Sequence, residues 1–220
     1  MRDLDFIEFI ECFGEATEKM QIPEASFIKW ENILPPTLIQ YWQNEGWAGY
    51  ANGLFWIVNP EDYEHIKDAW LKDTPLESLD KFHVIARSAF GNLYLCGENT
   101  GHSASIICNH NEILALRSRL KPKKLTAQSI TIQSLFGTSE PGDYDNTDSN
   151  GKPLFKRALK KYGPLAPDEV YGFEHALVAG GQPTLENLCK LKIDQHLLIL
   201  RNLDKSKLPF SDIDLVKPMN

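Results

Sequence analysis

Residues 34–63 of the chain read LPPTLIQYWQNEGWAGYANGLFWIVNPEDY and decide much of its local structure. Pro36 suits the first turn of a helix, where a missing N–H costs nothing, and Gly46 stands where the C-terminal cap of that helix belongs. Asn52-Gly53, between two aromatic runs, predicts a tight hairpin. Asn59-Pro60 is followed by two acidic residues, and this pattern predicts the start of a second helix.

The aromatic residues of this stretch suit either a hydrophobic core or a protein interface, because aromatic side chains dominate both. Within residues 53–58, both sets of alternating side chains are apolar, so this strand is predicted to be central and buried. We therefore expect most of the aromatic set to lie in the core: Tyr41, Trp42, Trp47, Tyr50, Phe55 and Trp56.

The 220-residue chain, 42% hydrophobic and 24% charged, has the composition of a soluble globular protein of one large or two small domains. No apolar run approaches the roughly 20 residues of a membrane helix. The first 15 residues, MRDLDFIEFIECFGE, lack the basic region of a signal peptide, so a cytosolic location is expected. Because cytosolic thiols stay reduced and no CxxC pair occurs, we expect neither disulfides nor zinc, but four buried free thiols: Cys12, Cys96, Cys108 and Cys189.

The acidic residues are concentrated in the first half of the chain. Residues 1–110 hold 7 Lys and Arg against 17 Asp and Glu, a net charge of −10, whereas residues 111–220 have a net charge of +3. The overall charge of −7 disfavours direct binding to nucleic acid, which requires a basic surface. An acidic half suits a basic protein partner, although acidic surfaces also serve solubility alone.

Residues 4–20 are predicted to form an amphipathic helix whose apolar stripe includes Phe6, Ile10, Phe13 and Met20. Its opposite face carries a ladder of carboxylates at spacings of three and four, with only Lys19 nearby to compensate: Glu8, Glu11, Glu15 and Glu18. Like charges at these spacings destabilise a helix. The ladder is therefore either retained for a partner or an ordinary solvated face.

The remaining pattern predicts an α+β fold with N-terminal helices and an antiparallel sheet, followed by a smaller, mostly helical C-terminal domain. A helix at 61–71 precedes four strands of a meander, at 83–90, 93–98, 103–108 and 113–116. A basic connection at 117–124 then separates two domains, 1–120 and 121–220. Helices are expected in the second domain at 126–136, 153–162, 167–172, 184–190 and 194–203.

The acidic loop at 137–151, GTSEPGDYDNTDSNG, suggests a calcium site, but the register of an EF-hand fails. With Gly151 at position six, position twelve is Arg157, a cation where a bidentate carboxylate is required. The loop is therefore predicted to be a turn that caps the helix entered at Pro153.

The sequence contains no recognisable catalytic, cofactor-binding or metal-binding motif. The six histidines form no HExxH, and no GxSxG elbow is present. Gly180-Gly181 lacks the Lys and Ser or Thr of a phosphate-binding loop. We therefore expect that the protein is not an enzyme and that it binds neither a cofactor nor a metal ion.

The chain resembles the GAD-like domain followed by a C-terminal immunity domain. The first match is the run of a proline-led helix ending in Tyr41-Trp42, an aromatic hairpin ending in Leu54-Phe55-Trp56, and Asn59-Pro60 followed by Tyr63, continued by residues 86–95. The second match rests on Leu154-Phe155, Ala158-Leu159, Tyr162-Gly163, Leu165, Glu169, Tyr171-Gly172-Phe173, Ala176-Leu177, Gly180-Gly181 and His196-Leu197. The pairing, which covers most of residues 10–205, is similar to immunity proteins that protect bacteria with type VI secretion from a DNase toxin.

This resemblance implies an inhibitor that binds a cognate DNase toxin stoichiometrically. We expect the carboxylate ladder to contact the toxin, with the acidic loop as the second candidate: Asp143, Tyr144, Asp145 and Asp148. Two other functions remain open at this stage, a non-catalytic regulatory or scaffold module and an enzyme. The name of the GAD-like domain is similar to that of an insertion domain in tRNA-handling enzymes. The acidic first half of this chain disfavours an RNA-binding surface, because such a surface is basic.

Overall fold

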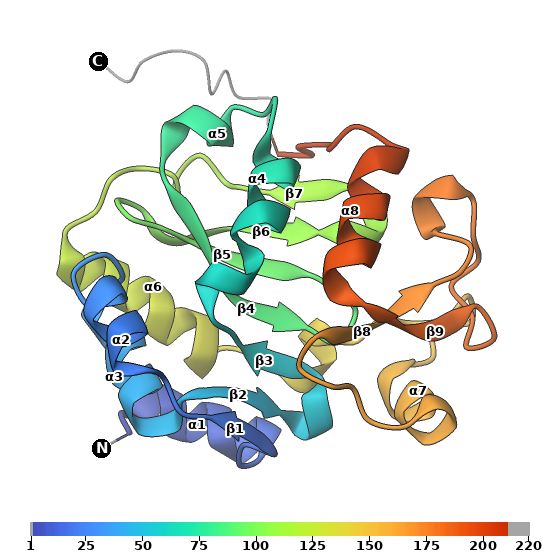
Figure 1. Cartoon of the computed structure of the whole chain (residues 1–220), viewed down its shortest axis with the longest axis horizontal. Helices are drawn as coiled ribbons and strands as arrows, with labels where there is room; N and C mark the ends of the chain where they lie inside the picture. Colours follow the sequence, from blue (N-terminus) through green and yellow to red (C-terminus); the bar gives the residue numbers. More distant parts are fainter. Residues whose placement is uncertain (1, 211–220) are drawn as a thin grey trace.

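The computed structural model describes residues 2–210, and within them the chain forms a seven-stranded antiparallel sheet at its centre (Figure 1). The strands pair in chain order, which confirms the predicted meander and the α+β fold. They are β1 (Glu18–Met20), β2 (Trp47–Tyr50), β3 (Phe55–Ile57), β4 (Phe82–Ser88), β5 (Leu93–Gly97), β6 (Gly101–Ile107) and β7 (Glu112–Leu114).

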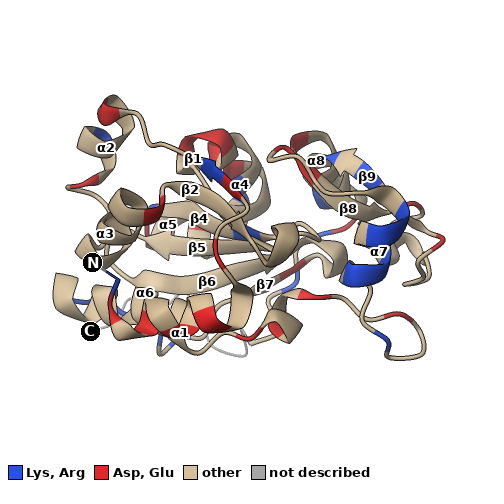
Figure 2. Ribbon diagram, turned by 90° about the horizontal axis from the view of Figure 1, so that it is seen from below, with Lys and Arg blue, Asp and Glu red and all other residues tan. Residues whose placement is uncertain are grey.

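Helices cover both faces of this sheet, as its edge-on view in Figure 2 shows. Helices α1 (Leu4–Phe13) and α6 (Leu125–Gly137) pack together on one face, while α4 (Glu64–Leu71) and α8 (Ile193–Leu203) pack together on the other. The remaining helices are α2 (Glu24–Trp30), α3 (Pro36–Glu45), α5 (Leu76–Leu79) and α7 (Phe155–Tyr162). Within the described residues, no helix has the length and apolarity required to cross a membrane.

The stretch at 34–63 folds largely as its turn residues predict. Helix α3 begins at Pro36 and ends before Gly46, whose φ of 74° provides the C-terminal cap. The hairpin of β2 and β3 is present, but its connection is a single 3₁₀ turn, η1 (Ala51–Gly53), rather than a two-residue turn. Asn59 caps a further 3₁₀ turn, η2 (Pro60–Tyr63), by accepting a hydrogen bond from the backbone N–H of Glu61, and α4 follows.

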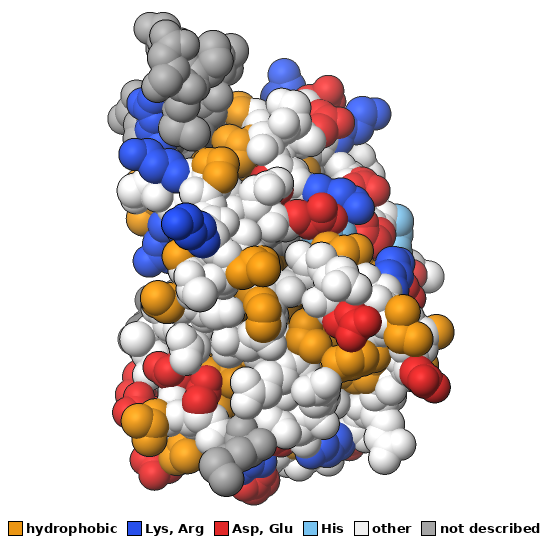
Figure 3. Space-filling view, turned by 90° about the vertical axis from the view of Figure 1, so that its left-hand side faces the viewer, with side chains coloured by type: hydrophobic (Ala, Val, Ile, Leu, Met, Phe, Trp, Pro, Cys, Tyr) orange, Lys and Arg blue, Asp and Glu red, His pale blue; other side chains and the backbone are white. Residues whose placement is uncertain are grey.

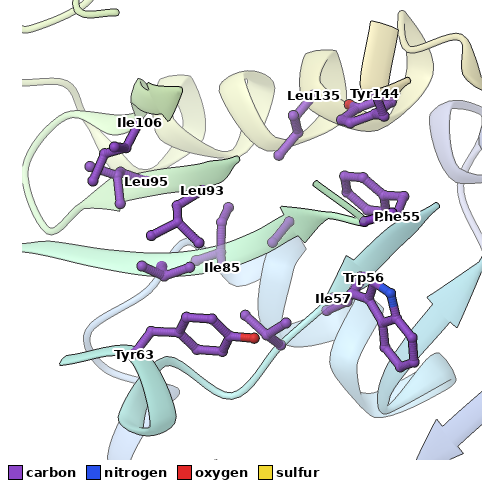
Figure 4. Packing of buried hydrophobic residues seen from close by; sticks show 14 of the residues in the cluster. Phe55, Trp56, Ile57, Tyr63, Ile85, Leu93, Leu95, Ile106, Leu135 and Tyr144 are labelled. Carbon is purple, nitrogen blue, oxygen red and sulfur yellow. The ribbon is translucent and has the colours of Figure 1, made fainter. Parts of the chain in front are cut away.

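An aromatic cluster fills the space between the sheet and the α1–α6 layer. The ring of Phe55 lies 5.4 Å from that of Phe9, 4.7 Å from that of Tyr144 and 5.9 Å from that of Phe136, centroid to centroid. Figure 4 shows Phe55 and Tyr144 on the side of the strand that faces α6, and Trp56 on the other side. All six aromatic residues expected in the core are buried, which confirms that expectation.

Several hydrogen bonds join the second half of the chain to the first, and three of them lie around α4 and β4. The guanidinium of Arg87 donates to the carbonyl of Pro167 (2.8 Å), and the indole N–H of Trp70 donates to the carbonyl of Leu197 (3.1 Å). The backbone N–H of Tyr171 donates to the carbonyl of Ala89 (2.9 Å). All three donors or acceptors of the first half lie in or next to α4 and β4, so these two elements organise the junction.

Helix α1 is shorter than predicted, and the predicted helix over 4–20 is wrong beyond Phe13. Gly14, with a φ of 77°, caps the helix through its backbone N–H to the carbonyl of Ile10. The chain then reverses into β1, so Glu15 and Met20 are not part of the helix, and Met20 is 47% exposed. A glycine at this position was a stop signal that the apolar periodicity concealed.

The second half contains a β-hairpin where helices were predicted. Residues predicted as helices at 167–172 and 184–190 instead form the strands β8 (Glu169–Phe173) and β9 (Leu188–Lys192). Short apolar runs do not distinguish a strand from a buried helix, and here the pairing of distant segments decides. Helices α6, α7 and α8 are present as expected. The domain boundary near residue 120 stays a prediction, and α6 beyond it packs on α1 and β6.

Truncation of Phe55 to alanine tests the aromatic cluster. We expect Phe55→Ala to lower the free energy of unfolding by about 3–5 kcal/mol, because it removes a buried ring and leaves a cavity. Urea denaturation followed by circular dichroism measures this difference. Ile28→Ala, at a side chain that is 58% exposed, is the control and should change stability by less than about 0.5 kcal/mol. Equal losses in the two variants would contradict a central role for Phe55.

Candidate functional site

The structure separates the predicted carboxylate ladder into two parts. Glu8 and Glu11 lie exposed on α1, as expected. Glu15 lies beyond the end of the helix and binds the guanidinium of Arg2 with both carboxylate oxygens, at 2.7 and 2.6 Å. Glu18 lies on β1, on the other side of the Gly14 turn. The ladder is therefore not uncompensated at Glu15, and Arg2 was the partner that sequence spacing did not reveal.

Three of the four loop residues proposed as toxin contacts have structural roles. Tyr144 is 3% exposed and donates or accepts a hydrogen bond with the hydroxyl of Ser139 at 2.6 Å. Asp145 caps α7, because its Oδ1 accepts from the backbone N–H groups of Leu154 and Phe155 at 3.2 and 2.8 Å. This cap is the one predicted for the loop, although the helix starts at Phe155 rather than Pro153.

Asp148 is also held within the loop. The backbone N–H of Lys152 and the guanidinium of Arg157 lower the pKa of Asp148 to about 2. The Arg157 to Asp148 distance is 2.6 Å, so the arginine that broke the calcium register is the partner of this carboxylate. Both groups are therefore satisfied inside the loop.

The fourth residue, Asp143, is exposed and lies near α1 in space. It sits in the 3₁₀ turn η4 (Pro141–Tyr144), where it and Glu140 cap each other's backbone N–H groups. The ring of Tyr144 lies 5.6 Å from that of Phe13, so η4 packs against the end of α1. The two separate sets of sequence candidates thus meet at one surface.

We call this surface the α1–η4 acidic face and define it by Glu8, Glu11, Glu140 and Asp143. All four side chains are exposed, and none forms an ion pair within residues 2–210. Figure 2 shows acidic residues along α1, and Figure 3 shows acidic side chains gathered at the lower edge of the molecule, where α1 lies. The electrostatic potential at this face is therefore negative.

The exposed thiol of Cys12 lies close to three of these carboxylates. Partial desolvation and the charges of Glu140, Glu11 and Glu8 raise the pKa of Cys12, which lies on α1. Cys12 is exposed and Cys189 is only partly buried, so the expectation of four buried thiols is correct for Cys96 and Cys108 alone. The thiol of Cys12 stays protonated at neutral pH, which makes it a poor nucleophile or metal ligand.

Two hydrophobic side chains lie on the exposed side of α1. Leu4 is 78% exposed and Ile7 is 40% exposed. At helical spacing, both lie next to Glu8 and Glu11 on the surface of α1. Exposed apolar groups next to unpaired carboxylates suit contact with a protein rather than with a small molecule.

A second cluster of ionisable groups, around His83, is enclosed by the fold. The imidazole of His83 is 1% exposed and contacts a carboxylate at each ring nitrogen, Glu64 at 2.8 Å and Glu98 at 3.0 Å. The ring of Trp30 covers it edge to face at 4.7 Å. Solvent does not reach the ring, and its contacts with the two partly exposed carboxylates join α4 to β4 and to the end of β5. No group with metal-binding geometry occurs among residues 2–210.

Comparisons with known proteins match both parts of the chain. Residues 5–110 match the GAD-like domain, and residues 130–204 match the domain described as T6SS immunity protein Tdi1, C-terminal. Among solved structures, that of Atu4351 from Agrobacterium tumefaciens has the same fold, with a TM-score of 0.76 and 22% identity over 89% of this chain and 88% of that chain. No curated protein sequence matches the chain significantly.

The Glu64–His83 contact predicts a loss of stability in acid. Burial acts to raise the pKa of Glu64, but hydrogen bonds from His83 and Lys67 outweigh it and lower that pKa from 4.5 to about 2. A carboxylate whose pKa is lower in the folded state stabilises the fold above pH 4.5, and this contribution disappears as the pH falls towards 2.

Urea titrations at pH 7 and pH 3 measure this effect. We expect Glu64→Gln to be less stable than the parent protein at pH 7, and the difference to shrink at pH 3. Glu31→Gln, an exposed glutamate, provides the control and should follow the parent protein at both values. A difference for Glu64→Gln that is the same at both pH values would contradict the assignment.

Proposed function

Since the chain combines a GAD-like domain with the C-terminal domain of the type VI secretion immunity protein Tdi1, we propose that it binds and neutralises a cognate DNase toxin. The Tdi1 domain supports an immunity function and a protein toxin as the partner. The nature of that toxin as a DNase is the further step that we propose. It rests on the charge of the α1–η4 acidic face.

The observation that carries this proposal is the exposure of four unpaired carboxylates on one surface. DNases contact the phosphate backbone through lysine and arginine, so their substrate-binding surfaces are basic. A protein that presents carboxylates at matching positions competes with DNA for that surface. Leu4 and Ile7 add apolar contact area beside the carboxylates, which electrostatics alone does not supply.

Inhibition by binding requires no chemistry from the immunity protein. The imidazole of the one histidine held between two carboxylates is enclosed, and partial desolvation and the neighbouring carboxylates raise the pKa of the thiol on α1. The protein then works by occupying the toxin, one molecule for one molecule. A residual toxin molecule is harmful to a cell, so we expect a dissociation constant of about 1 nM or lower.

Titration of the toxin's DNase activity distinguishes binding from turnover. With the toxin well above the dissociation constant, activity should fall linearly and reach zero at a fixed molar ratio of immunity protein to toxin. Plasmid cleavage on agarose gels or a fluorescent DNA substrate measures the end point. Continued loss of toxin activity after substoichiometric addition of the immunity protein would falsify the binding mechanism.

Charge reversal on α1 tests the acidic face. We expect Glu8→Lys with Glu11→Lys to slow association with the toxin by about tenfold at low salt and to flatten its salt dependence, because exposed charges act mainly on the association rate. Stopped-flow fluorescence at several salt concentrations measures both quantities. Glu15 is left unchanged, since its reversal would break the contact with Arg2.

The control changes the net charge equally but elsewhere. Glu31 and Glu186 are exposed and lie outside the α1–η4 acidic face. Glu31→Lys with Glu186→Lys should slow association less than about twofold at physiological salt, where the Debye length is about 8 Å. If both pairs of substitutions slow association equally, net charge alone is responsible, and the acidic face is not the steering surface.

A further inference from the structure

A pocket of 440 Å³ lies where the β1–β3 edge of the sheet meets the second half of the chain. We call it the β1–α8 pocket. The first half contributes β1, β2, β3 and η2 to its lining, and the second half contributes Pro167, Asp168, Ile193 and Asp194. It lies on the opposite face of the sheet from the α1–η4 acidic face, because Trp56 and Phe55 point to opposite sides (Figure 4). The two surfaces are therefore separate.

Two tryptophans form the buried part of this pocket, and the structure fixes one of them firmly. Trp56 is paired across the strands with Gly49, where a Cβ would come within 3.1 Å of the indole ring, so a larger residue there would displace it. The guanidinium of Arg87 lies 4.6 Å from the centre of the same ring. The indole N–H of Trp56 donates to the carbonyl of Gly53 at 2.8 Å. This side of the pocket is therefore preformed.

The other tryptophan has an unsatisfied hydrogen-bond donor. Trp47 is 6% exposed, and its Nε1 has no acceptor among the described residues. A buried N–H without an acceptor is destabilising, because it has lost its hydrogen bonds to water. The Nε1 atom itself is enclosed by the protein, so Trp47 offers the pocket the aromatic surface of its ring rather than a free donor.

The remaining lining is rich in carboxylates. Glu18, Asp62, Asp168 and Asp194 all contribute. Only Asp168 has an ion pair within the described residues, with Lys192 at 2.5 Å. Lys19, the lysine that lines the pocket, binds Glu45 at 3.4 Å instead. Three carboxylates at the pocket thus lack a cationic partner.

Burial raises the pKa of one of these carboxylates, Asp62, and a nearby cation would lower it. Burial, followed by the charge of Glu61, raises the pKa of Asp62. A positive charge placed beside Asp62 would offset both effects. The pocket is therefore electrostatically complementary to a cation and offers aromatic surface for an attached apolar stem.

We propose that the β1–α8 pocket receives an arginine side chain from the toxin, as an anchor distinct from the steering contact at α1. The inference rests on the proposed function. Arginine fits the lining because its planar guanidinium binds carboxylates with two hydrogen bonds and packs against aromatic rings. An anchor that becomes buried governs the dissociation rate, whereas the α1–η4 acidic face governs association.

The pocket can be tested first without a toxin, using N-acetyl-arginine amide as the probe. In protein labelled with ¹⁵N-tryptophan, the indole N–H signals are assigned by Trp47→Phe and Trp56→Phe. We expect the probe to shift the signals of Trp47 and Trp56 but not that of Trp70, which already donates to Leu197. N-acetyl-citrulline amide has the same shape without the charge and should shift neither signal. Equal shifts from both compounds would overturn the assignment of a cation site.

A second experiment measures how fast the complex with the toxin dissociates. We expect Glu18→Lys with Asp194→Lys to speed dissociation of the preformed complex by about tenfold or more, with a smaller change in association. The milder pair Glu18→Gln and Asp194→Asn should change dissociation in the same direction and guards against misfolding, because it adds no charge of its own. Glu31→Lys with Glu186→Lys serves again as the control with equal net charge, and its dissociation should change less than twofold.

The outcomes separate this inference from the proposed function. If the protein still inhibits the toxin and the pocket variants dissociate at the parent rate, the pocket inference fails and the proposed function stands. If the parent protein neither binds nor inhibits the toxin, the proposed function fails, and the probe experiment alone decides whether the pocket binds arginine. Faster dissociation in both pocket variants, with parent-like circular dichroism, supports the arginine anchor.

Discussion

The buried guanidinium of Arg87 is the interaction on which the arrangement of the two halves depends. Arg87 is 0% exposed, and no carboxylate lies within ion-pair distance of it in residues 2–210. Burial lowers its pKa, against the opposing effects of Tyr63 and Asp168. Carbonyl oxygens of Ser88 and Pro167 accept its hydrogen bonds, and the ring of Trp56 covers it. A buried cation without hydrogen-bond partners is strongly destabilising. If the segment around Pro167 separated from β4, Arg87 would lose one of its acceptors, and this loss opposes the separation.

The same residue connects the fold to its surface chemistry. Arg87 supports Trp56 from the side of β4, and Trp56 in turn lines a pocket to which both halves contribute. On the opposite face of the sheet, Phe55 belongs to the aromatic cluster that packs against α1. Two consecutive residues of β3 therefore support two different surfaces. Each surface takes two carboxylates from the first half of the chain and two from the second, which the bulk charges of the halves did not indicate.

Local sequence signals correctly predicted the elements whose ends are set by their own residues. They did not predict the elements whose conformation depends on pairing with distant segments. Pro36 and Gly46 bound α3 as expected, and the successive turns predicted the meander correctly. The strands β8 and β9 were missed because neither short apolar run shows by itself that it pairs with the other, fifteen residues away. Among the candidate contacts, the burial of Tyr144 was not predicted, since a tyrosine in an acidic loop gives no sequence signal that its ring packs on Phe55. Long-range packing of this kind has no local pattern.

The pairing of seven strands in chain order has a consequence for how the protein is made. A sheet in which each strand pairs with its predecessor can assemble as the chain leaves the ribosome, because most contacts close short loops. Its α1 face is different, since α6 completes that layer and is not synthesised until residue 137. Until then Phe9 and Phe55 lack the cover of Phe136. The nascent chain therefore passes through an interval in which this apolar surface is not yet covered by α6.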